Sequence, residues 1–221
     1  MKIGIGIFAK TIGYSKVKTR LAEDIGQKLA EEFYSLSVKA VEEVVTKYSL
    51  SSLNEIEIYW AKPSGNYDIC TKGLGLGAAI HKVAKQILKE CDVYLIIGTD
   101  TPQISGETID SALNILGKNN GKMVFGPSYD GGFYLMAGTI LPSLEIMESV
   151  RYSQEDTLEQ LLKFIDIDDK KYTLIKELSD VDVVDDLKNI RSYLENEVVN
   201  NDNLLESQKF ILEWLNIKNL A

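Results

Sequence analysis

The stretch that decides the fold is Ile3-Gly-Ile-Gly-Ile-Phe-Ala9, a nearly continuous apolar run that ends abruptly at Lys10. Such a run is typical of a central strand in a parallel sheet, because both faces of that strand are buried. The two glycines lie inside the run and not in a turn after it. We therefore interpret them as strand residues that allow close packing, and not as a dinucleotide-binding fingerprint.

Strands and helices alternate along the rest of the chain. Apolar residues spaced three and four apart predict a long amphipathic helix over residues 23–47. Further strands are expected at 55–61, 92–98, 122–125 and 172–178, and further helices at 78–90, 105–116, 153–164, 185–196 and 204–215, with Ser105 and Ser153 as N-caps. This alternation predicts a mostly parallel central sheet flanked by helices. We expect one domain over residues 1–198, with a C-terminal amphipathic helix at 199–221 packed on it.

The composition indicates a globular protein. The 221 residues are 45% hydrophobic and 26% charged, which suits one large domain. A net charge of −9 argues against a general nucleic-acid binder, which needs clustered basic residues. With one histidine and two cysteines, Cys70 and Cys91, the chain lacks a structural zinc set and fits a reducing compartment. It shows neither a signal peptide nor a membrane span, so we expect a cytoplasmic protein.

Basic residues gather near the N-terminus of this acidic chain. Residues 1–20 contain no acid, whereas residues 177–206 carry nine acids against two basic residues. A basic loop after the first strand is a candidate seat for a nucleotide diphosphate, although lysines that simply solvate a loop are an equal alternative. The basic side chains of this N-terminal segment are Lys2, Lys10, Lys16, Lys18 and Arg20.

Two glycine- and histidine-containing segments give weaker signals. The stretch Gly73-Leu-Gly-Leu-Gly77 has neither fingerprint nor P-loop spacing, so we interpret it as a flexible loop that approaches a ligand. His81 lies in a predicted helix, and no nucleophile elbow accompanies it. A serine-hydrolase triad therefore has little support.

Aspartates stand where predicted strands end. Asp100 follows the strand at 92–98, at the sheet edge where ligands bind in open α/β folds. Asp130 precedes Gly131 and Gly132, which permit a tight turn with close backbone approach to a ligand.

A third group of acids follows the predicted strand at 172–178 and comprises Asp180, Asp182, Asp185 and Asp186. Crowded carboxylates repel one another unless a cation lies between them, and Mg²⁺ or Mn²⁺ is the natural cation for oxygen ligands. Asp185 and Asp186 are expected to cap the next helix, so Asp182 is the ligand candidate in this group.

Six short motifs follow one another along residues 3–190: Phe8-Ala-Lys10, Val17-Lys-Thr-Arg-Leu21, Ile97-Gly-Thr-Asp-Thr-Pro102, Gly126-Pro-Ser-Tyr-Asp-Gly-Gly-Phe-Tyr-Leu135, Tyr152-Ser153 and Asp180-Val-Asp-Val-Val-Asp-Asp-Leu187. In this order they resemble the glycosyltransferase-like family catalogued as DUF2064. The resemblance implies a single-domain, Rossmann-like fold of the GT-A type, the fold of nucleotide-diphospho-sugar transferases.

The resemblance also implies roles for the matching residues. The nucleotide would be held by Ala9, Lys10, Lys18, Arg20 and Asp100, and the sugar or acceptor by Asp130, Gly131, Gly132 and Ser153. Asp100 and Asp182 would bind the metal ion, and Asp130 would act as the catalytic base. Three departures stand out. Gly98-Thr-Asp100 lacks the first acid of the D-x-D motif of GT-A enzymes, and Tyr152 replaces the family's usual Trp. The loop Thr11-Ile-Gly-Tyr-Ser-Lys16 stands where the family usually has prolines and a glycine.

The predicted function is that of a metal-dependent glycosyltransferase using Mg²⁺ or Mn²⁺. It would pass a sugar from a nucleoside-diphosphate sugar to a hydroxyl group of a small-molecule or lipid-linked acceptor. One alternative is a nucleotidyltransferase that attacks an NTP and releases pyrophosphate, because the basic segment at 18–20 fits either substrate. A second alternative is a non-catalytic nucleotide-binding protein, against which the second metal-ligand candidate argues.

Overall fold

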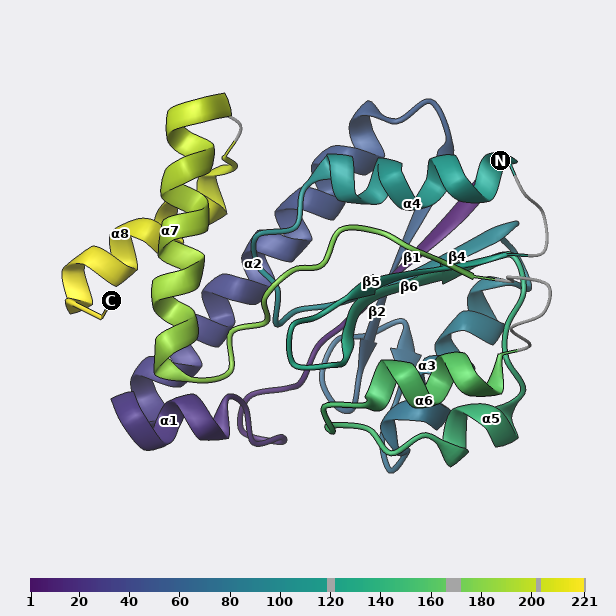
Figure 1. Ribbon diagram of the computed structural model, residues 1–221, viewed down its shortest axis with the longest axis horizontal. Helices are drawn as coiled ribbons and strands as arrows, with labels where there is room; N and C mark the ends of the chain where they lie inside the picture. The colour runs from purple at the N-terminus through teal and green to yellow at the C-terminus, as the bar shows by residue number, and fades with distance from the viewer. Residues whose placement is uncertain (119–121, 166–171, 202–203, 221) are drawn as a thin grey trace.

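Seven strands form one sheet in the order β3-β2-β1-β4-β6-β5-β7. The computed structural model describes residues 1–118, 122–165, 172–201 and 204–220 (Figure 1). β6 runs antiparallel to its neighbours β4 and β5, and every other pairing is parallel. The strands are β1 (Lys2–Phe8), β2 (Glu55–Lys62), β3 (Ile69–Cys70), β4 (Val93–Gly98), β5 (Met123–Pro127), β6 (Phe133–Gly138) and β7 (Tyr172–Leu174). The mostly parallel sheet of the predicted α/β fold is confirmed.

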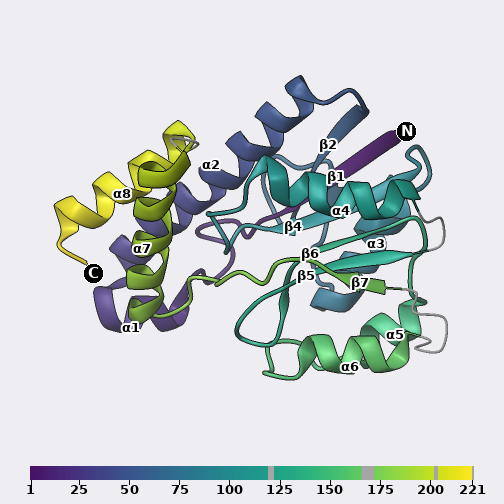
Figure 2. The ribbon, with the colours of Figure 1, turned by 45° about the horizontal axis from the view of Figure 1, so that its top comes forward.

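Helices cover both faces of the sheet. In Figures 1 and 2, α2 and α4 lie over one face, and α3, α5 and α6 lie over the other. The remaining helices, α1, α7 and α8, gather with the first part of α2 at one end of the molecule. The bounds are α1 (Thr19–Ile25), α2 (Gln27–Ser51), α3 (Leu76–Ile87), α4 (Gly106–Lys118), α5 (Leu144–Ser149), α6 (Thr157–Phe164), α7 (Val184–Asn201) and α8 (Glu206–Lys218).

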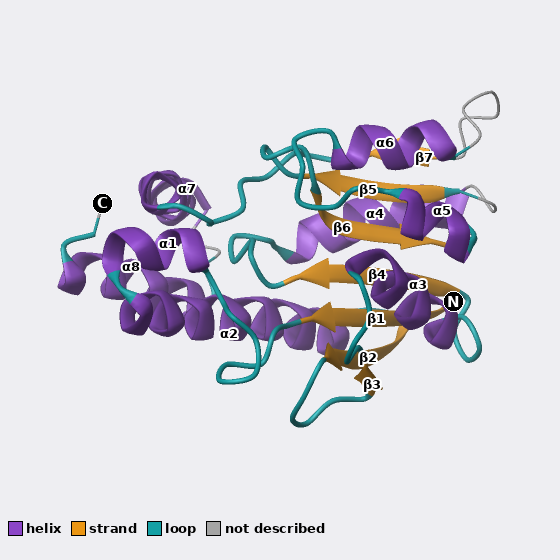
Figure 3. Cartoon of the chain, turned by 90° about the horizontal axis from the view of Figure 1, so that it is seen from below, coloured by secondary structure: helices purple, strands orange, loops and turns teal. Residues whose placement is uncertain are grey.

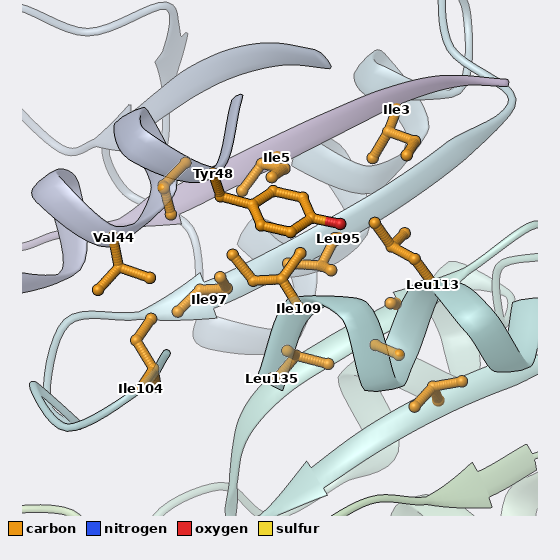
Figure 4. Packing of buried hydrophobic residues seen from close by; sticks show 14 of the residues in the cluster. Ile3, Ile5, Val44, Tyr48, Leu95, Ile97, Ile104, Ile109, Leu113 and Leu135 are labelled. Carbon is orange, nitrogen blue, oxygen red and sulfur yellow. The ribbon is translucent and has the colours of Figure 1, made fainter. Parts of the chain in front are cut away.

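The alternation along β1 explains its two glycines. Ile3, Ile5 and Ile7 are fully buried in the core beneath α2 and α4 (Figure 4). Gly4 and Gly6 face α3, and a Cβ atom on Gly4 would lie 2.2 Å from a methyl carbon of Ile87. The predicted packing role of the glycines is confirmed, because α3 approaches β1 too closely for any side chain at Gly4.

A separate hydrophobic cluster holds the helices at the end of the sheet. It joins α1 and α2 to α7 and α8, with Leu21, Phe33 and Leu187 among its fully buried members. In Figure 3 the arrowheads of β1 and β4 point toward this helical group. The helices therefore extend the molecule beyond the carboxyl ends of the two central strands.

Three predicted elements have different bounds. The single helix expected at 23–47 is divided by Gly26, whose φ of 85° separates α1 from α2. The strand expected at 172–178 ends at Leu174. The helix expected from Ser153 begins only at Thr157, so the predicted Ser153 N-cap is wrong. Ser153 has a left-handed φ of 61°, and Asp156 is the N-cap residue.

Three elements were not predicted. β6 is an apolar run of six residues, which periodicity alone does not assign to strand or helix. Short β3 carries little sequence signal. The N-terminus of α5 is capped by Ser143, whose hydroxyl accepts a hydrogen bond from the backbone N–H of Ile146 at 3.3 Å.

The C-terminal helix packs on the rest of the chain. Trp214 of α8 lies against Phe33 of α2, with ring centroids 5.7 Å apart. The boundary expected at residue 198 falls inside α7, and the division into two parts stays a prediction. Among the described residues, no helix has both the length and the apolar character needed to cross a membrane.

Candidate functional site

The carboxyl ends of β1 and β4 lie side by side. Phe8 pairs with Gly98 at the end of the two parallel strands, so Lys10 and Asp100 emerge at the same edge of the sheet. The Thr99 hydroxyl donates to the Phe8 carbonyl at 3.2 Å and fixes the start of the second loop against the first. This geometry confirms that Asp100 stands at the sheet edge.

A cavity of about 510 Å³ opens at this edge. Its walls come from the loops after β1, β4 and β5, from the segment before α7, and from the start of α3. The glycine-rich stretch also reaches it, through Gly73 and Leu74. Of the predicted site residues, those that line the cavity are Ala9, Lys10, Asp100, Asp130, Gly132, Ser153 and Asp182.

Lys18 connects the two predicted metal ligands. Its side chain is only 2% exposed, and its ammonium group contacts the Asp100 carboxylate and lies 3.3 Å from Oδ1 of Asp182. Arg20 reaches the other oxygen of Asp182, with Nη2 2.5 Å from Oδ2. Lys18 and Arg20 thus bind acids of the cavity wall, and neither lines the cavity itself; Lys18 is buried, whereas Arg20 is exposed.

The charges of this group depend on one another. Burial alone lowers the pKa of Lys18, but the carboxylates of Asp100 and Asp182 outweigh it and hold that pKa above its usual value. Burial raises the pKa of Asp182, whereas Lys18 and Arg20 lower it further than burial raises it. Lys18 and Asp182 are therefore both charged at neutral pH, as paired groups in a partly buried site must be.

Backbone hydrogen bonds bring Asp182 to Asp100. The segment after β7 is held along the sheet edge by the N–H of Leu178, which donates to the Pro127 carbonyl at 3.1 Å. The N–H of Val181 then donates to the Asp100 carbonyl at 3.0 Å. Beyond it, Asp186 accepts hydrogen bonds from the N–H groups of Asp182 and Val183 before α7, which agrees with its predicted capping role.

Asp180 is a site residue that the sequence argument set aside. It lines the cavity and accepts a hydrogen bond from the hydroxyl of Thr101. Burial and the nearby carboxylates of Asp100 and Asp130 raise the pKa of Asp180 to about 7, although the Thr101 hydroxyl lowers it. Asp180 lies close to Asp100 because the next residue, Val181, donates its N–H to the Asp100 carbonyl. No pattern in the sequence distinguishes Asp180 from the neighbouring acids.

Asp130 lies in the tight turn between β5 and β6. Its Oδ1 accepts hydrogen bonds from the Ser128 hydroxyl at 2.7 Å and from the Gly132 N–H at 3.0 Å. The side chain is exposed at the cavity. These two hydrogen bonds to Oδ1 fix the orientation of the Asp130 carboxylate within the turn.

Gly131 lies against the backbone of the segment before α6. Gly131 has a φ of 83°, and a Cβ there would lie 1.7 Å from the Glu155 carbonyl oxygen. It packs against the chain before α6 and does not line the cavity, unlike Gly132 and Ser153. The close approach at Gly131 is therefore to the backbone of the chain itself, and the approach of the two glycines to a ligand stays a prediction.

The N-terminal basic residues do not form one patch. Lys2 lies at the opposite end of β1, where its Nζ is 2.7 Å from Glu57. Lys18 and Arg20 are paired with acids. Lys10 and Lys16 are exposed and have no ion-pair partner among the described residues. Proximity in sequence therefore overstated the local positive charge, which the acids after β4 and β7 offset.

The donor set fits a divalent cation that arrives with phosphate ligands. Asp100 and Asp182 face one shared position, where the Lys18 ammonium lies. Mg²⁺ is commonly held by one or two carboxylates together with substrate phosphates and water. No cluster of three or more acidic, histidine or cysteine side chains able to hold a metal ion occurs in the described part of the chain. Metal binding here stays a prediction.

A larger cavity of about 710 Å³ contains none of the predicted site residues. It lies between the end of α2 and the start of α4, and Tyr48 and Asp110 on its wall bind each other at 2.6 Å. The smaller cavity is the candidate site, because it collects separate acids and cations at the carboxyl edge of the sheet.

Comparison with known proteins supports the predicted resemblance. The model of DUF2064, described as an uncharacterized protein conserved in bacteria, matches residues 61–154. The resemblance is confirmed over this stretch, which contains Asp100 and Asp130 but neither Lys18 nor Asp182. No curated protein matches the chain in sequence.

Solved structures show the same fold. The crystal structure named "putative nucleotide-diphospho-sugar transferase" from Desulfovibrio desulfuricans G20 superposes with a TM-score of 0.77 at 20% identity, over 97% of this chain and 95% of that one. The bifunctional IspDF from Campylobacter jejuni gives a TM-score of 0.51 at 10% identity, over 85% of this chain and 54% of that one. At these identities the likeness concerns the fold, and it confirms the predicted fold class.

Proposed function

We propose that the protein is a metal-dependent glycosyltransferase that binds a nucleoside-diphosphate sugar in the 510 Å³ cavity. The observation that carries the proposal is the meeting of Asp100 and Asp182 at one cation position, at the carboxyl edge of β1 and β4. Two half-exposed carboxylates that face one position repel each other unless a cation lies there. A nucleotide with a metal ion on its diphosphate meets this requirement.

Three basic residues would hold the diphosphate. Lys10 lines the cavity, and Lys18 and Arg20 lie directly behind the acids. When the sugar–phosphate bond breaks, negative charge develops on the departing diphosphate, and these cations offset it. A bound Mg²⁺ or Mn²⁺ would supply further charge neutralisation at the same phosphates.

Asp130 would accept the proton of the acceptor hydroxyl. Its Oδ1 is held by Ser128 and Gly132, so the carboxylate has a defined orientation toward the cavity. As the acceptor oxygen forms its bond to the sugar carbon, the bond from that carbon to the diphosphate breaks and the hydroxyl proton passes to Asp130. Gly132 and Ser153 lie beside it on the wall, where the sugar or acceptor would bind.

A thermal-shift panel tests this function. UDP, GDP, CDP, their sugars and the parent NTPs are each added with and without Mn²⁺. A ligand at 100 times its Kd stabilises a protein by about 2.7 kcal/mol, on the order of 5–10 °C for a chain of this size. We expect an NDP or NDP-sugar to stabilise the protein with metal. Stabilisation by an NTP alone would favour nucleotidyl transfer, and no shift with any ligand would contradict nucleotide binding.

A further inference from the structure

We propose that Lys18 is a built-in counter-cation that holds the position between Asp100 and Asp182 until a nucleotide diphosphate draws its ammonium away, so that a divalent cation binds there only together with the nucleotide. This inference rests on the proposed function, because it concerns the same two carboxylates. It adds an order of binding and assigns Lys18 a positioning role before nucleotide binds that differs from its role with nucleotide bound.

The burial of Lys18 is the first observation. Lysine side chains are almost never fully buried unless they are paired, yet this one is 2% exposed. Its ammonium contacts Asp100 and Asp182, which approach it from the loop after β4 and from the segment before α7. It therefore lies at the point where two acids that are distant in sequence converge.

The backbone holds Lys18 in this place. The residue has a left-handed φ of 46° at the N-cap of α1, and its carbonyl accepts the Ala22 N–H at 2.8 Å. Left-handed backbone is uncommon for residues other than glycine. Because α1 fixes the backbone of Lys18, the ammonium group can change its position only through rotation of the flexible side chain.

An ammonium group and a divalent cation exclude each other from this position. Both would bind the Asp100 carboxylate, and positive charges within a few ångströms of each other repel even near a protein surface. Asp100 is 44% exposed, so the position is reached from the cavity side while Lys18 blocks it from the protein side. A metal ion alone must therefore displace Lys18 without offering it a new partner.

A diphosphate changes this balance. In the structure, Lys18 and Arg20 pair with Asp100 and Asp182, so two positive charges meet two negative ones, and the Asp180 carboxyl lies nearby on the cavity wall. A diphosphate alone adds uncompensated negative charge, and a metal alone adds uncompensated positive charge. With both present, the phosphates bind Lys18 while the metal takes the carboxylates. Each ligand thus strengthens the binding of the other, as linkage requires.

Direct Mn²⁺ binding to the nucleotide-free protein tests the inference. The loss of the electron paramagnetic resonance signal of free Mn²⁺ measures the Kd of wild type, Lys18→Met, Lys18→Arg and Lys16→Met. Removing the ammonium should lower the Kd of Lys18→Met for Mn²⁺ at least tenfold. Lys18→Arg keeps the charge and Lys16 is exposed without an ion-pair partner among the described residues, so both should match wild type. A Lys18→Met protein that binds Mn²⁺ no better than wild type would overturn the inference.

Two further measurements separate this inference from folding and from the proposed function. If Lys18→Met does not fold, Lys18→Gln replaces it, and Mn²⁺ without nucleotide should raise the melting temperature of the neutral variant but not that of wild type. In wild type, adding UDP, GDP or CDP should tighten Mn²⁺ binding at least tenfold for one of them. If the neutral variant gains Mn²⁺ affinity while no diphosphate affects wild type, the counter-cation role stands and the nucleotide function fails.

Discussion

Asp100 is the residue that joins the parts of the site. It follows the buried strand β4, its carboxylate contacts Lys18, and its carbonyl accepts the N–H of Val181. The side chain supplies charge, whereas the backbone positions the segment that carries Asp182. A substitution that changes only the side-chain charge should therefore separate binding from folding.

Asp100→Asn should reduce Mn²⁺-dependent nucleotide binding at least tenfold while the fold survives. The backbone bond to Val181 persists, and Lys18 retains Asp182 at 3.3 Å. The lost charge pairing should cost about 1–3 kcal/mol of unfolding free energy. Calorimetric titration gives the affinity, and a circular-dichroism melt serves as the folding control. Unchanged metal-dependent affinity in a folded variant would remove Asp100 from the metal site.

Asp130→Asn should lower turnover about 10²–10⁴-fold with nucleotide affinity nearly unchanged. The amide oxygen of asparagine still accepts hydrogen bonds from Ser128 and Gly132, so the turn should keep its shape. Steady-state kinetics with the identified donor and acceptor measure kcat, and titration with the nucleotide measures affinity. A variant with wild-type kcat would show that another group accepts the proton.

At the scale of elements, the packing of α3 on β1 depends on two glycines that differ in their available space. A Cβ on Gly4 would lie 2.2 Å from Ile87, whereas a Cβ on Gly6 would lie 3.1 Å from Val83. The strand carries its isoleucines on the opposite face, toward α2 and α4. One face of β1 therefore packs closely against α3, and the other packs into the hydrophobic core beneath α2 and α4.

Gly4→Ala should destabilise the protein by about 2–3 kcal/mol, and Gly6→Ala by less than about 1.5 kcal/mol. The first substitution requires α3 to move, and the second requires only small adjustments of side chains. Urea unfolding of the two variants beside wild type measures the difference. Equal losses in both variants would mean that α3 does not approach β1 as closely as described.

The docking of α8 on α2 should depend on pH through Glu43. Burial raises the pKa of Glu43, but its ion pair with Lys47 at 2.9 Å and the Ser207 N–H at 2.8 Å lower it further. A group with a lowered folded-state pKa stabilises the protein above its unfolded pKa of roughly 4.3 and loses this effect as pH falls through the folded value.

Glu43→Gln should therefore lower the unfolding free energy on the order of 1 kcal/mol at pH 7, and the difference from wild type should shrink as pH falls below the unfolded pKa of roughly 4.3 and through the lowered folded value. Urea unfolding across this pH range measures it. Glu42→Gln is the matched control, because Glu42 is the exposed neighbour on the same helix. A pH-independent difference for Glu43→Gln would show that its charge does not contribute to the contact.

At the scale of the whole molecule, the strand order assembles the site from distant segments. β1 and β4 are neighbours in the centre of the sheet. β7 pairs with β5 and leads into the segment that contains Asp180 and Asp182. The helical group of α1, α7 and α8 lies beyond the carboxyl ends of β1 and β4 (Figure 3), and the start of α1 brings Lys18 and Arg20 to the acids. Charges more than 80 residues apart in sequence thus meet at one edge.

Much of this architecture was predictable because local patterns determine it. The apolar runs of β1 and β4 identify buried strands, and parallel strands bring their carboxyl ends together. That logic placed Asp100 and the loop of Lys10 at one edge. β6 was missed because its apolar run, Phe133–Gly138, follows directly on the turn motif of Asp130 and has no distinctive periodicity.

The charge pairing inside the site was not predictable from one sequence. Lys18 and Arg20 were expected to hold phosphates, yet in the structure they bind Asp100 and Asp182. That pairing depends on how the segment after β7 lies on the Asp100 loop, which is set by long-range backbone hydrogen bonds. For the same reason, no local pattern marked Asp180 as a half-buried acid on the cavity wall.

The most direct test of the proposed site is a calorimetric titration of the nucleoside diphosphate that the thermal-shift panel identifies. Wild type and Asp182→Asn are each titrated with and without Mn²⁺. In wild type, Mn²⁺ should tighten binding at least tenfold, and in Asp182→Asn this gain should disappear while the variant stays folded. Equal affinity with and without Mn²⁺ in wild type would contradict a metal-assisted diphosphate site between Asp100 and Asp182.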